Sequence, residues 1–504
     1  MFFLIIATLL LITIIYLWNN RHFFNRDIYK NFSDNDVPWI KNGFSIAFFN
    51  PVEIFQLVRT IAKKYQKSYH LTIFANTDYF IVKAKDAEKI LSSSKHLEKG
   101  LIYELLHPFL KTGLLTSAGE KWHQRRKMLT PAFHFNILRE FCEIFKEESD
   151  RLVEVIKSQK GKEVNIIPIS TQFTLNTICE SAMGVKLSNL GNTGNKYRDN
   201  IYLIGELLVQ RILKPWLLVD IIYKLLGYSY QLEQLLRPVH EFTQTIIKSR
   251  RNEYLLKKLE TQDLNNNEND KENIYLSSKK KRAAMMDTLL QAQSDGLIDD
   301  EGIIEETDTF TFEGHDTTSV GMTFVLFLLS HHPEVQEKIF QEIKDITDGR
   351  DELSLDDLNK MNLMERVLKE SLRLYPPVHF IARKLSDDLY NDGILLKKDT
   401  IVNIMIFDIH RDPEYFPEPE KFDPDRFLPE NFEKRHNFAY LAFSAGMRNC
   451  IGQRFAMLEL KTMLTKIVLN FKILPVTSFD ELIFKGDIVL RTQNPIIIKF
   501  MSRN

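Results

Sequence analysis

The chain of 504 residues is long enough for up to about three domains, and its 44% hydrophobic and 11% aromatic content is that of a protein with a large core. Lys and Arg together (66) nearly balance Asp and Glu (67), which argues against a nucleic-acid partner. The three cysteines include no Cys-x-x-Cys pair, which argues against a disulfide framework or a zinc cluster and favours a reducing compartment.

The N-terminus carries the pattern of a membrane anchor. Residues 2–18 have no charged side chain and are just long enough to span a bilayer as a helix. A cleaved signal peptide is the alternative, but it requires a basic start and a small-residue cleavage site, and neither is found. Arg21, Arg26 and Lys30 follow the segment, so the positive-inside rule leaves the rest of the chain in the cytosol. The chain is thus predicted to consist of an anchor, a linker and one catalytic domain, over 1–20, 21–50 and 51–504.

Short strands are predicted before most of the helices. Residues 71–74 and 79–82 are rich in β-branched and aromatic side chains and flank Asn76-Thr77-Asp78, which is typical of a β-hairpin. Much later, residues 260–282 are polar and repetitive, and they predict a mobile surface loop within the catalytic domain.

A long helix is predicted over 301–329, where apolar residues recur at helical spacing. A polar stripe inside an apolar helix is costly to bury unless it serves a site. Gly314 lowers the stability of the helix by up to about 1 kcal/mol relative to alanine, yet it lets a flat ligand come close or the helix widen. The residues that we place on one face are Thr309, Glu313, Asp316, Thr317 and Val320.

Cys450 lies at the mouth of a helix predicted over 453–460. Unpaired backbone N–H groups and the positive end of the helix dipole favour a thiolate there, and a thiolate suits a soft metal. Gly446 and Gly452 bracket the cysteine where the backbone must turn or approach something flat. The alternative is that Cys450 is only a small buried hydrophobe.

Two pairs of side chains lie one helical turn apart. Trp122 and Arg126 share a helix face, which also fits a basic helix exposed to solvent. Glu370 and Arg373 can form an ion pair, and their apolar flanks indicate that the pair is buried.

Together these motifs resemble, in order, those of one enzyme family. Residues 443–452 match Phe-x-x-Gly-x-Arg-x-Cys-x-Gly at every fixed position, and Glu313-Gly-His-Asp-Thr-Thr318 and Glu370-x-x-Arg373 precede it. The chain resembles the cytochrome P-450 monooxygenases, in which a cysteine thiolate is the axial ligand of haem iron. The resemblance implies a mainly α fold with a small β region, and haem b as cofactor with Cys450 as the metal ligand.

Other site residues follow from the resemblance alone. Asp316 and Thr317 would be the acid and the alcohol that relay protons to dioxygen, although Thr317 could merely bond a carbonyl one turn back. Arg426 would lock the Glu370–Arg373 pair and brace the loop of Cys450, a structural role. The further cofactor-binding positions that it implies, largely at the haem propionates, are Trp122, Arg126, Arg383, Arg448, Phe443 and Gly452.

Glu313 stands where the family more usually has alanine. The run 307–319 resembles the fatty-acid omega-hydroxylase branch, of the family 4 type, in which this glutamate can be esterified to a haem methyl group. The ester would stiffen the haem and favour attack on a chain terminus. Alternatively, Glu313 is a hydrogen-bonded buried acid.

The resulting prediction is a membrane-bound haem-thiolate monooxygenase that hydroxylates fatty acids at the omega position with O2 and electrons from NADPH. Because no Gly-x-Gly-x-x-Gly fingerprint occurs, the electrons come from a separate NADPH–cytochrome reductase, with cytochrome b5 as a second candidate donor. The predicted location is the endoplasmic reticulum membrane, with the catalytic domain facing the cytosol. The residues expected to meet an acidic donor are Lys121, Arg125, Lys127 and Arg454.

Three alternatives stay open at this point. The same chemistry could act on foreign compounds, hormones or hydrocarbon derivatives. A haem protein could instead sense a gas without turnover, but Asp316 and Thr317 argue against this because binding alone needs no proton relay. Residues 201–228, interrupted at Lys214-Pro215, fit either a substrate-covering segment that dips into the membrane or a plain pair of core helices.

Overall fold

The computed structural model of the protein describes Leu11 and residues 49–73, 76–190, 193–266, 285–350, 353–391 and 393–503. The predicted anchor and linker therefore lie outside the described residues, apart from Leu11 and residues 49 and 50. Within these ranges, we find no helix whose length and hydropathy would let it cross a bilayer.

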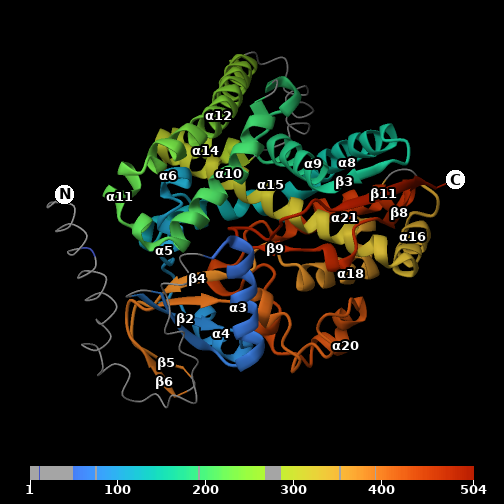
Figure 1. Ribbon diagram of the computed structural model, residues 1–504. Helices are drawn as coiled ribbons and strands as arrows, with labels where there is room; N and C mark the ends of the chain where they lie inside the picture. Colours follow the sequence, from blue (N-terminus) through green and yellow to red (C-terminus); the bar gives the residue numbers. More distant parts are fainter. Residues whose placement is uncertain are drawn as a thin grey trace.

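A body of packed helices surrounds the long helix α15 (Asp300–His331) (Figure 1). The α15 helix begins where the Asp299 carboxylate accepts a hydrogen bond from Gly302 N–H, and it ends before Pro333, which cannot continue it. Most of its residues are buried, as its apolar spacing predicts. The helices packed against it include α9 (Ile166–Ser181), α12 (Tyr228–Asn266), α18 (Asn362–Leu374) and α21 (Gln453–Asn470).

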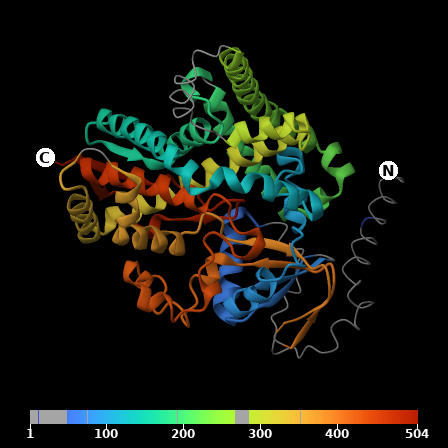
Figure 2. The ribbon, with the colours of Figure 1, turned by 180° about the vertical axis from the view of Figure 1, so that it is seen from behind.

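The remaining helices complete this body and cover the sheets (Figure 2). They are α3 (Pro51–Tyr65), α4 (Ala84–Leu91), α5 (Leu101–Glu104), α6 (His107–Leu110), α7 (Gly119–Leu129), α8 (Phe135–Ser158), α10 (Thr193–Leu213), α11 (Asp220–Leu225), α14 (Met285–Ser294), α16 (Pro333–Thr347), α17 (Leu355–Lys360), α19 (Ile406–Ile409) and α20 (Pro429–Phe432).

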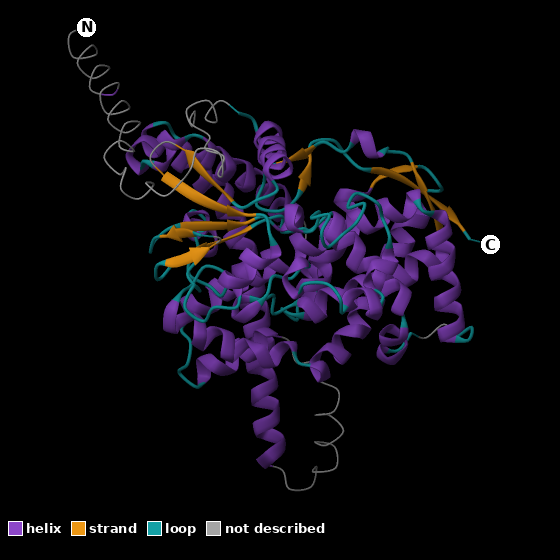
Figure 3. Ribbon diagram, turned by 90° about the horizontal axis from the view of Figure 1, so that it is seen from below, coloured by secondary structure: helices purple, strands orange, loops and turns teal. Residues whose placement is uncertain are grey.

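The main sheet lies at one end of the molecule (Figure 3) and has the strand order β1-β2-β7-β4. Its strands alternate between two apolar clusters, because successive side chains point to opposite faces. Phe80 packs into the cluster of α3 residues, whereas Tyr79 and Ile81 pack into the cluster of α4 residues. The strands are β1 (Tyr69–Ile73), β2 (Asn76–Ile81), β7 (Ile401–Ile404) and β4 (Ile381–Lys384).

Three smaller sheets complete the β region. A three-stranded sheet close to the C-terminus packs beside α15 and α21, and a short hairpin, β9–β10, reaches the centre of the molecule. Their strands are β3 (Glu163–Asn165), β11 (Ile497–Ser502) and β8 (Phe471–Pro475); β9 (Phe484–Lys485) and β10 (Arg491–Thr492); and β5 (Leu389–Asn391) and β6 (Ile394–Leu396). A mainly helical protein with a small β region is therefore confirmed.

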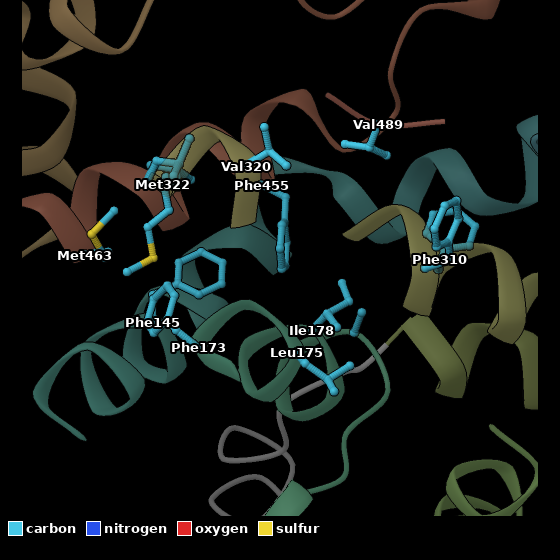
Figure 4. Packing of buried hydrophobic residues seen from close by; sticks show 14 of the residues in the cluster. Phe145, Phe173, Leu175, Ile178, Phe310, Val320, Met322, Phe455, Met463 and Val489 are labelled. Atoms are coloured by element: carbon cyan, nitrogen blue, oxygen red, sulfur yellow. The ribbon is translucent and has the colours of Figure 1, made fainter. Parts of the chain in front are cut away.

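The largest apolar cluster of the described residues joins the two halves of the chain. In Figure 4, Phe145 of α8 and Phe173 of α9 lie close to Met322 of α15 and Met463 of α21. The cluster thus holds α15 between the helices that precede and follow it, which fixes the position of its polar residues.

Two local predictions were wrong. The hairpin turn does not lie at Asn76-Thr77-Asp78, because these residues pair with β1 in the ladder, and the Asp78 carboxylate accepts a hydrogen bond from Asn403 at 3.1 Å. The predicted loop at 260–282 starts too early: residues 260–266 continue α12, and 267–282 lie outside the described residues. At residues 76–78, strand pairing prevails over the local turn signal. At residues 260–266, continuation of the helix prevails over the polar composition.

Residues 201–228 combine features of a pair of core helices with features of a segment that could contact a membrane. The interruption at Lys214-Pro215 is confirmed, since α10 ends at Leu213 and a 3-10 turn, η4 (Pro215–Leu218), follows. The α10 helix packs much of its apolar surface into the core. By contrast, Ile221 and Leu225 of α11 are 67% and 81% exposed, so this part of the segment presents apolar side chains at the surface.

Candidate functional site

One cavity brings together the two stretches that carry the strongest motifs. Cys450 lines it from the loop before α21, and Glu313 and Thr317 line it from α15. Trp122 and Arg126 of α7 also contribute to the lining. Five residues predicted as site residues, separated by up to 328 positions in sequence (450 minus 122), therefore meet around one space.

The loop of Cys450 is a tight turn closed by a backbone hydrogen bond. The N–H of Cys450 donates to the carbonyl oxygen of Phe443 at 2.9 Å, and Gly452 caps the following helix α21. Gly446 has a φ of +70°, and a Cβ atom there would lie 1.8 Å from the carbonyl oxygen of Leu91. Only glycine therefore fits at the point where this loop meets the end of α4.

Gly446→Ala is expected to prevent most of the protein from folding with a bound cofactor, because the backbone of the loop or of Leu91 would have to move. Gly296→Ala is the matched control: its φ is +71°, but an added Cβ meets nothing within 4 Å. We expect the control to cost about 1 kcal/mol in the free energy of unfolding. Purified yield and absorbance of bound cofactor measure the difference, and equal results for the two variants would contradict this role of Gly446.

The expected thiolate at Cys450 is not a property of the loop by itself. The side chain is exposed to the cavity. Burial raises the pKa of the thiol to about 11, which outweighs the lowering by the Gly452 N–H and by Arg126. Helix-end polarity is therefore insufficient, and a coordinated metal cation would supply the missing stabilisation of the thiolate.

Three cations gather at the cavity without an ionic partner. Arg383 of β4, Arg448 and Lys99 all line it, and no carboxylate of the described residues lies within 4.0 Å of their charged nitrogens. Arg383 is 2% exposed, and within the described part of the chain its one hydrogen bond is to the carbonyl of Ala382. Burial, followed by repulsion from Arg383, lowers the pKa of Arg448 to about 9. Burial also lowers the pKa of Lys99, with further lowering by Arg383 and Arg448.

Such uncompensated buried cations are costly unless an anion binds. Arg448 is held in place by the carbonyl groups of Leu114 and Ser117, at 3.3 and 2.5 Å, and its guanidinium lies 4.3 Å from the ring centre of Trp122. Its Nε atom has no hydrogen-bond partner among the residues that the structure describes. A ligand with two carboxylates and a flat apolar body fits this arrangement, which is the character of haem b.

Arg126 has a different position from the other arginines. It donates to the backbone carbonyl and to the side-chain oxygen of Asn449, both at 2.7 Å. Arg126 therefore ties α7 to the residue before Cys450, in addition to lining the cavity.

The predicted stripe on α15 is partly wrong. Thr309, Glu313 and Thr317 line the cavity, but Asp316 and Val320 do not. Successive residues of a helix are rotated by about 100°, so the face that meets the cavity centres nearer Thr317 and turns Asp316 away. Asp316 instead accepts two hydrogen bonds from Arg491, at 2.7 and 2.9 Å.

Gly314 has a structural role in addition to the one predicted. A Cβ at this position would lie 2.6 Å from the Cδ1 atom of Ile178 on α9. Figure 4 shows Ile178 in the core cluster. The glycine therefore lets α9 approach α15, and it also lines the cavity of Cys450, which agrees with the expectation that a flat ligand comes close to it.

Thr317 and Glu313 are linked through the helix backbone. The Thr317 hydroxyl donates to the carbonyl oxygen of Glu313 at 2.7 Å, which is the bond that the alternative predicted. The hydroxyl oxygen still has free lone pairs, so this bond does not prevent it from accepting a hydrogen bond. Burial raises the pKa of the Glu313 carboxyl to about 7, although nearby Lys99 opposes the shift.

The Glu370–Arg373 pair is completely buried. Arg373 forms two hydrogen bonds with the Glu370 carboxylate, at 2.7 and 2.8 Å, and Arg426 lies 3.4 Å from the same carboxylate. Arg373 also donates to three carbonyl groups of the following segment. His410, which the sequence did not single out, accepts from the N–H of Leu441 at 2.7 Å. This network connects α18 to the chain just before the Cys450 loop.

The basic residues expected to meet an electron donor fall into two groups. Lys121 forms an ion pair with Glu305 at 2.8 Å, and Arg125, only 11% exposed, lies 3.7 Å from the same carboxylate. Lys127 and Arg454 are exposed. Because Arg125 interacts with α15, fewer of the four basic residues are available to an electron donor at the surface.

Sequence comparison agrees with this site. The family model of cytochrome P450 matches residues 34–500. Probable cytochrome P450 4ac2 of Drosophila melanogaster is 44% identical over 464 residues, which cover 92% of this chain and 88% of that protein. Cytochrome P450 4V2 of Homo sapiens is 41% identical over 427 residues, which cover 84% and 79% of the two chains.

The similarity extends over almost the whole catalytic region and involves an enzyme family, which sets aside the gas-sensor alternative. The expected cofactor, haem b, agrees with the uncompensated cations around the cavity. The chain therefore belongs to the cytochrome P450 family, within family 4, and is a haem monooxygenase that uses O2, NADPH-derived electrons delivered by a redox partner, and a hydrophobic substrate.

Proposed function

We propose that this P450 hydroxylates fatty acids at or near the terminal carbon. The observation that carries the proposal is the Glu313 carboxylate in a cavity that is otherwise lined largely by apolar side chains. Such a lining accepts an alkyl chain, and a residue larger than the usual alanine at position 313 narrows the approach. Narrow access favours the chain end over the weaker C–H bonds beside it.

The residues around the cavity have separate proposed tasks. Cys450 holds the haem iron, and the haem supplies the oxygen-activating chemistry when bound. Arg383, Arg448 and Trp122 hold the propionate side of the cofactor. Phe443 and Gly452 shape the loop beneath it, and Arg126 fixes that loop through Asn449.

Proton delivery is proposed to involve two residues of α15. The Thr317 hydroxyl lines the cavity and is oriented by its bond to the Glu313 carbonyl. Asp316 is the acid that supplies protons to this region, from the position where Arg491 holds it. The pair would limit loss of reduced oxygen as peroxide, because it would supply protons at the Thr317 hydroxyl, on the wall of the cavity.

Glu313 is also proposed to form an ester with a haem methyl group. The bond would join a carboxylate oxygen to the methyl carbon, with loss of one hydrogen from that carbon. This is a two-electron oxidation, for which O2 and NADPH of the established reaction are the oxidant and the electron source. A buried, hydrogen-bonded acid remains the alternative for Glu313.

Acid extraction with organic solvent separates these two roles. After turnover with NADPH, haem is expected to stay on the wild-type polypeptide, whereas Glu313→Ala should release all of it. The variant is also expected to shift products from the terminal carbon toward its neighbours. Mass spectrometry of the polypeptide and its products measures both effects. Complete release of haem from the wild type would leave Glu313 as a free acid.

Membrane contact is part of the proposal. The exposed apolar residues of α11 and its surroundings, Val219, Ile221, Leu225 and Leu226, support contact with a lipid surface. Together with the uncharged residues 2–18, they favour an enzyme at the endoplasmic reticulum membrane with its catalytic domain in the cytosol. We further propose that NADPH–cytochrome reductase, and cytochrome b5, dock near the exposed Lys127 and Arg454.

Reconstitution with reductase and NADPH tests the proposed substrate class. A panel of fatty acids of increasing length, with matched alkanes and polycyclic hydrophobic compounds, is analysed for the position of oxygen insertion. Terminal hydroxylation of fatty acids is the expected result. Turnover of polycyclic compounds without any fatty-acid product would contradict the proposal.

A further inference from the structure

Arg491 of β10 forms a buried ion pair with the acid of α15. Its Nη2 atom donates to both carboxylate oxygens of Asp316, at 2.7 and 2.9 Å. The two side chains are 9% and 1% exposed. A second carboxylate, Asp487, lies 3.7 Å from Nε of the same guanidinium. The charge of Arg491 is therefore balanced inside the protein, and proximity to Asp316 raises its pKa despite the opposing effect of burial.

The pair joins three parts of the fold. Asp316 belongs to α15, and Arg491 belongs to the β9–β10 hairpin. The guanidinium also lies 4.1 Å from the ring centre of Tyr202 on α10. Two residues of the same hairpin turn, Ile488 and Val489, line the cavity that contains Cys450. Arg491 thus connects a wall of the cavity to the acid next to Thr317.

The contacts around the pair leave little freedom for it. Gly205 of α10 lies so close to Asp487 that an added Cβ would be 2.6 Å from the carboxylate. The Tyr202 hydroxyl is itself within 3.2 Å of the Thr171 hydroxyl on α9. A carboxylate held by two hydrogen bonds in such packing has a fixed orientation.

We infer that Arg491 is a positioning residue for the monooxygenase reaction, one that holds the Asp316 carboxylate at a fixed place behind the cavity and joins it to the turn of Ile488 and Val489. The inference rests on the proposed role of Asp316 in proton delivery. Asp316 does not line the cavity, so its exchange of protons with that space depends on where Arg491 keeps it. Removal of Arg491 therefore acts on coupling, meaning the fraction of NADPH electrons recovered in product.

A double-mutant cycle tests this dependence on Asp316. The variants are Arg491→Gln, Asp316→Asn and the combination, and the readout is peroxide formed per NADPH consumed in the reconstituted enzyme. We expect Arg491→Gln and Asp316→Asn each to raise the peroxide fraction at least about 3-fold. In the Asp316→Asn background, Arg491→Gln is expected to add no further increase, because its effect passes through that carboxylate. Arg491→Lys, which keeps the charge, should restore part of the coupling.

Arg503→Gln is the matched control. The side chain of Arg503 is 8% exposed, pairs with Glu337 at 2.8 Å and lies 4.0 Å from the ring centre of Phe340, and none of the three residues lines the cavity. Loss of a buried arginine alone would affect the control similarly. If Arg491→Gln leaves no active enzyme in which to measure the peroxide fraction, the peroxide fractions of Arg491→Lys and of the double variant, in which both charges are absent, are compared with those of the wild type and of Asp316→Asn.

Two results would overturn the inference. One is a peroxide fraction for Arg491→Gln equal to that of Arg503→Gln. The other is an equal increase in peroxide with and without the Asp316 carboxylate. An Asp316→Asn variant as well coupled as the wild type would overturn the relay and the inference together. Absence of fatty-acid products would overturn only the proposed substrate class, because peroxide release is measured with any substrate that is turned over.

Discussion

Cys450→Ser is expected to abolish product formation in the reconstituted enzyme. A serine hydroxyl at this position would not ionise, and the donation of electron density by a thiolate would be lost. The loop itself should persist, since the backbone bond from residue 450 to the Phe443 carbonyl does not involve the sulfur. Turnover of the best substrate in the panel, with haem content measured in parallel, gives the result.

Cys142→Ser is the control for this substitution. Cys142 of α8 is 2% exposed and belongs to the apolar core, away from the cavity lining. Burial raises the pKa of its thiol to about 11, as for Cys450, so the two cysteines differ in place rather than in acidity. The control should lose stability but keep its turnover per bound haem. Product formation by Cys450→Ser at the rate of the control would be incompatible with its role as iron ligand.

Arg373→Ala is expected to lower the free energy of unfolding by about 3–5 kcal/mol, because it leaves the Glu370 carboxylate buried without its partner. Both side chains are 0% exposed. The carbonyl groups of His410, Pro419 and Lys421 would also lose their donor. Urea unfolding followed by tryptophan fluorescence, together with haem loss on mild heating, measures the effect.

Arg366→Ala on the same helix is the matched control. Arg366 pairs with Asp425 at 3.3 Å, and that carboxylate is 65% exposed. An exposed ion pair contributes at most about 1 kcal/mol. A cost for Arg373→Ala no larger than that of the control would show that the buried pair does not brace the fold.

The sequence predicted well those features that depend on periodicity and spacing. The helix over 301–329 and the break at Lys214-Pro215 are confirmed, as is the mainly helical fold. Each follows from a local pattern, in which apolar spacing or proline determines the backbone within one or two turns. The family motifs then predicted that residues far apart in the sequence belong to one site.

The errors concern contacts between distant residues. Asp316 and Arg491 are 175 positions apart, and no local pattern predicts which face of α15 turns to the β9–β10 hairpin. The close approach of α9 to Gly314 was not predicted, for the same reason. Lys99 joins Arg383 and Arg448 at the cavity only because the chain folds back, and its neighbours in sequence, Glu98 and Gly100, give no sign of an apolar cavity.

The early start predicted for the polar loop has a different cause. A polar composition indicates only that a segment is exposed to solvent. An exposed helix end is as compatible with this composition as a loop is, and α12 continues to Asn266. Likewise, the thiolate at Cys450 was predicted from the helix dipole, whereas burial has the larger effect on the pKa.

The central claim is that the Cys450 thiolate would bind haem iron in the cavity that α15 also lines. The most direct measurement is the absorption spectrum of the reduced protein with carbon monoxide. A thiolate ligand predicts the red-shifted Soret band that is typical of this family, and loss of that band in Cys450→Ser. A wild-type protein that binds haem but shows the Soret band of a neutral or histidine ligand would contradict the claim.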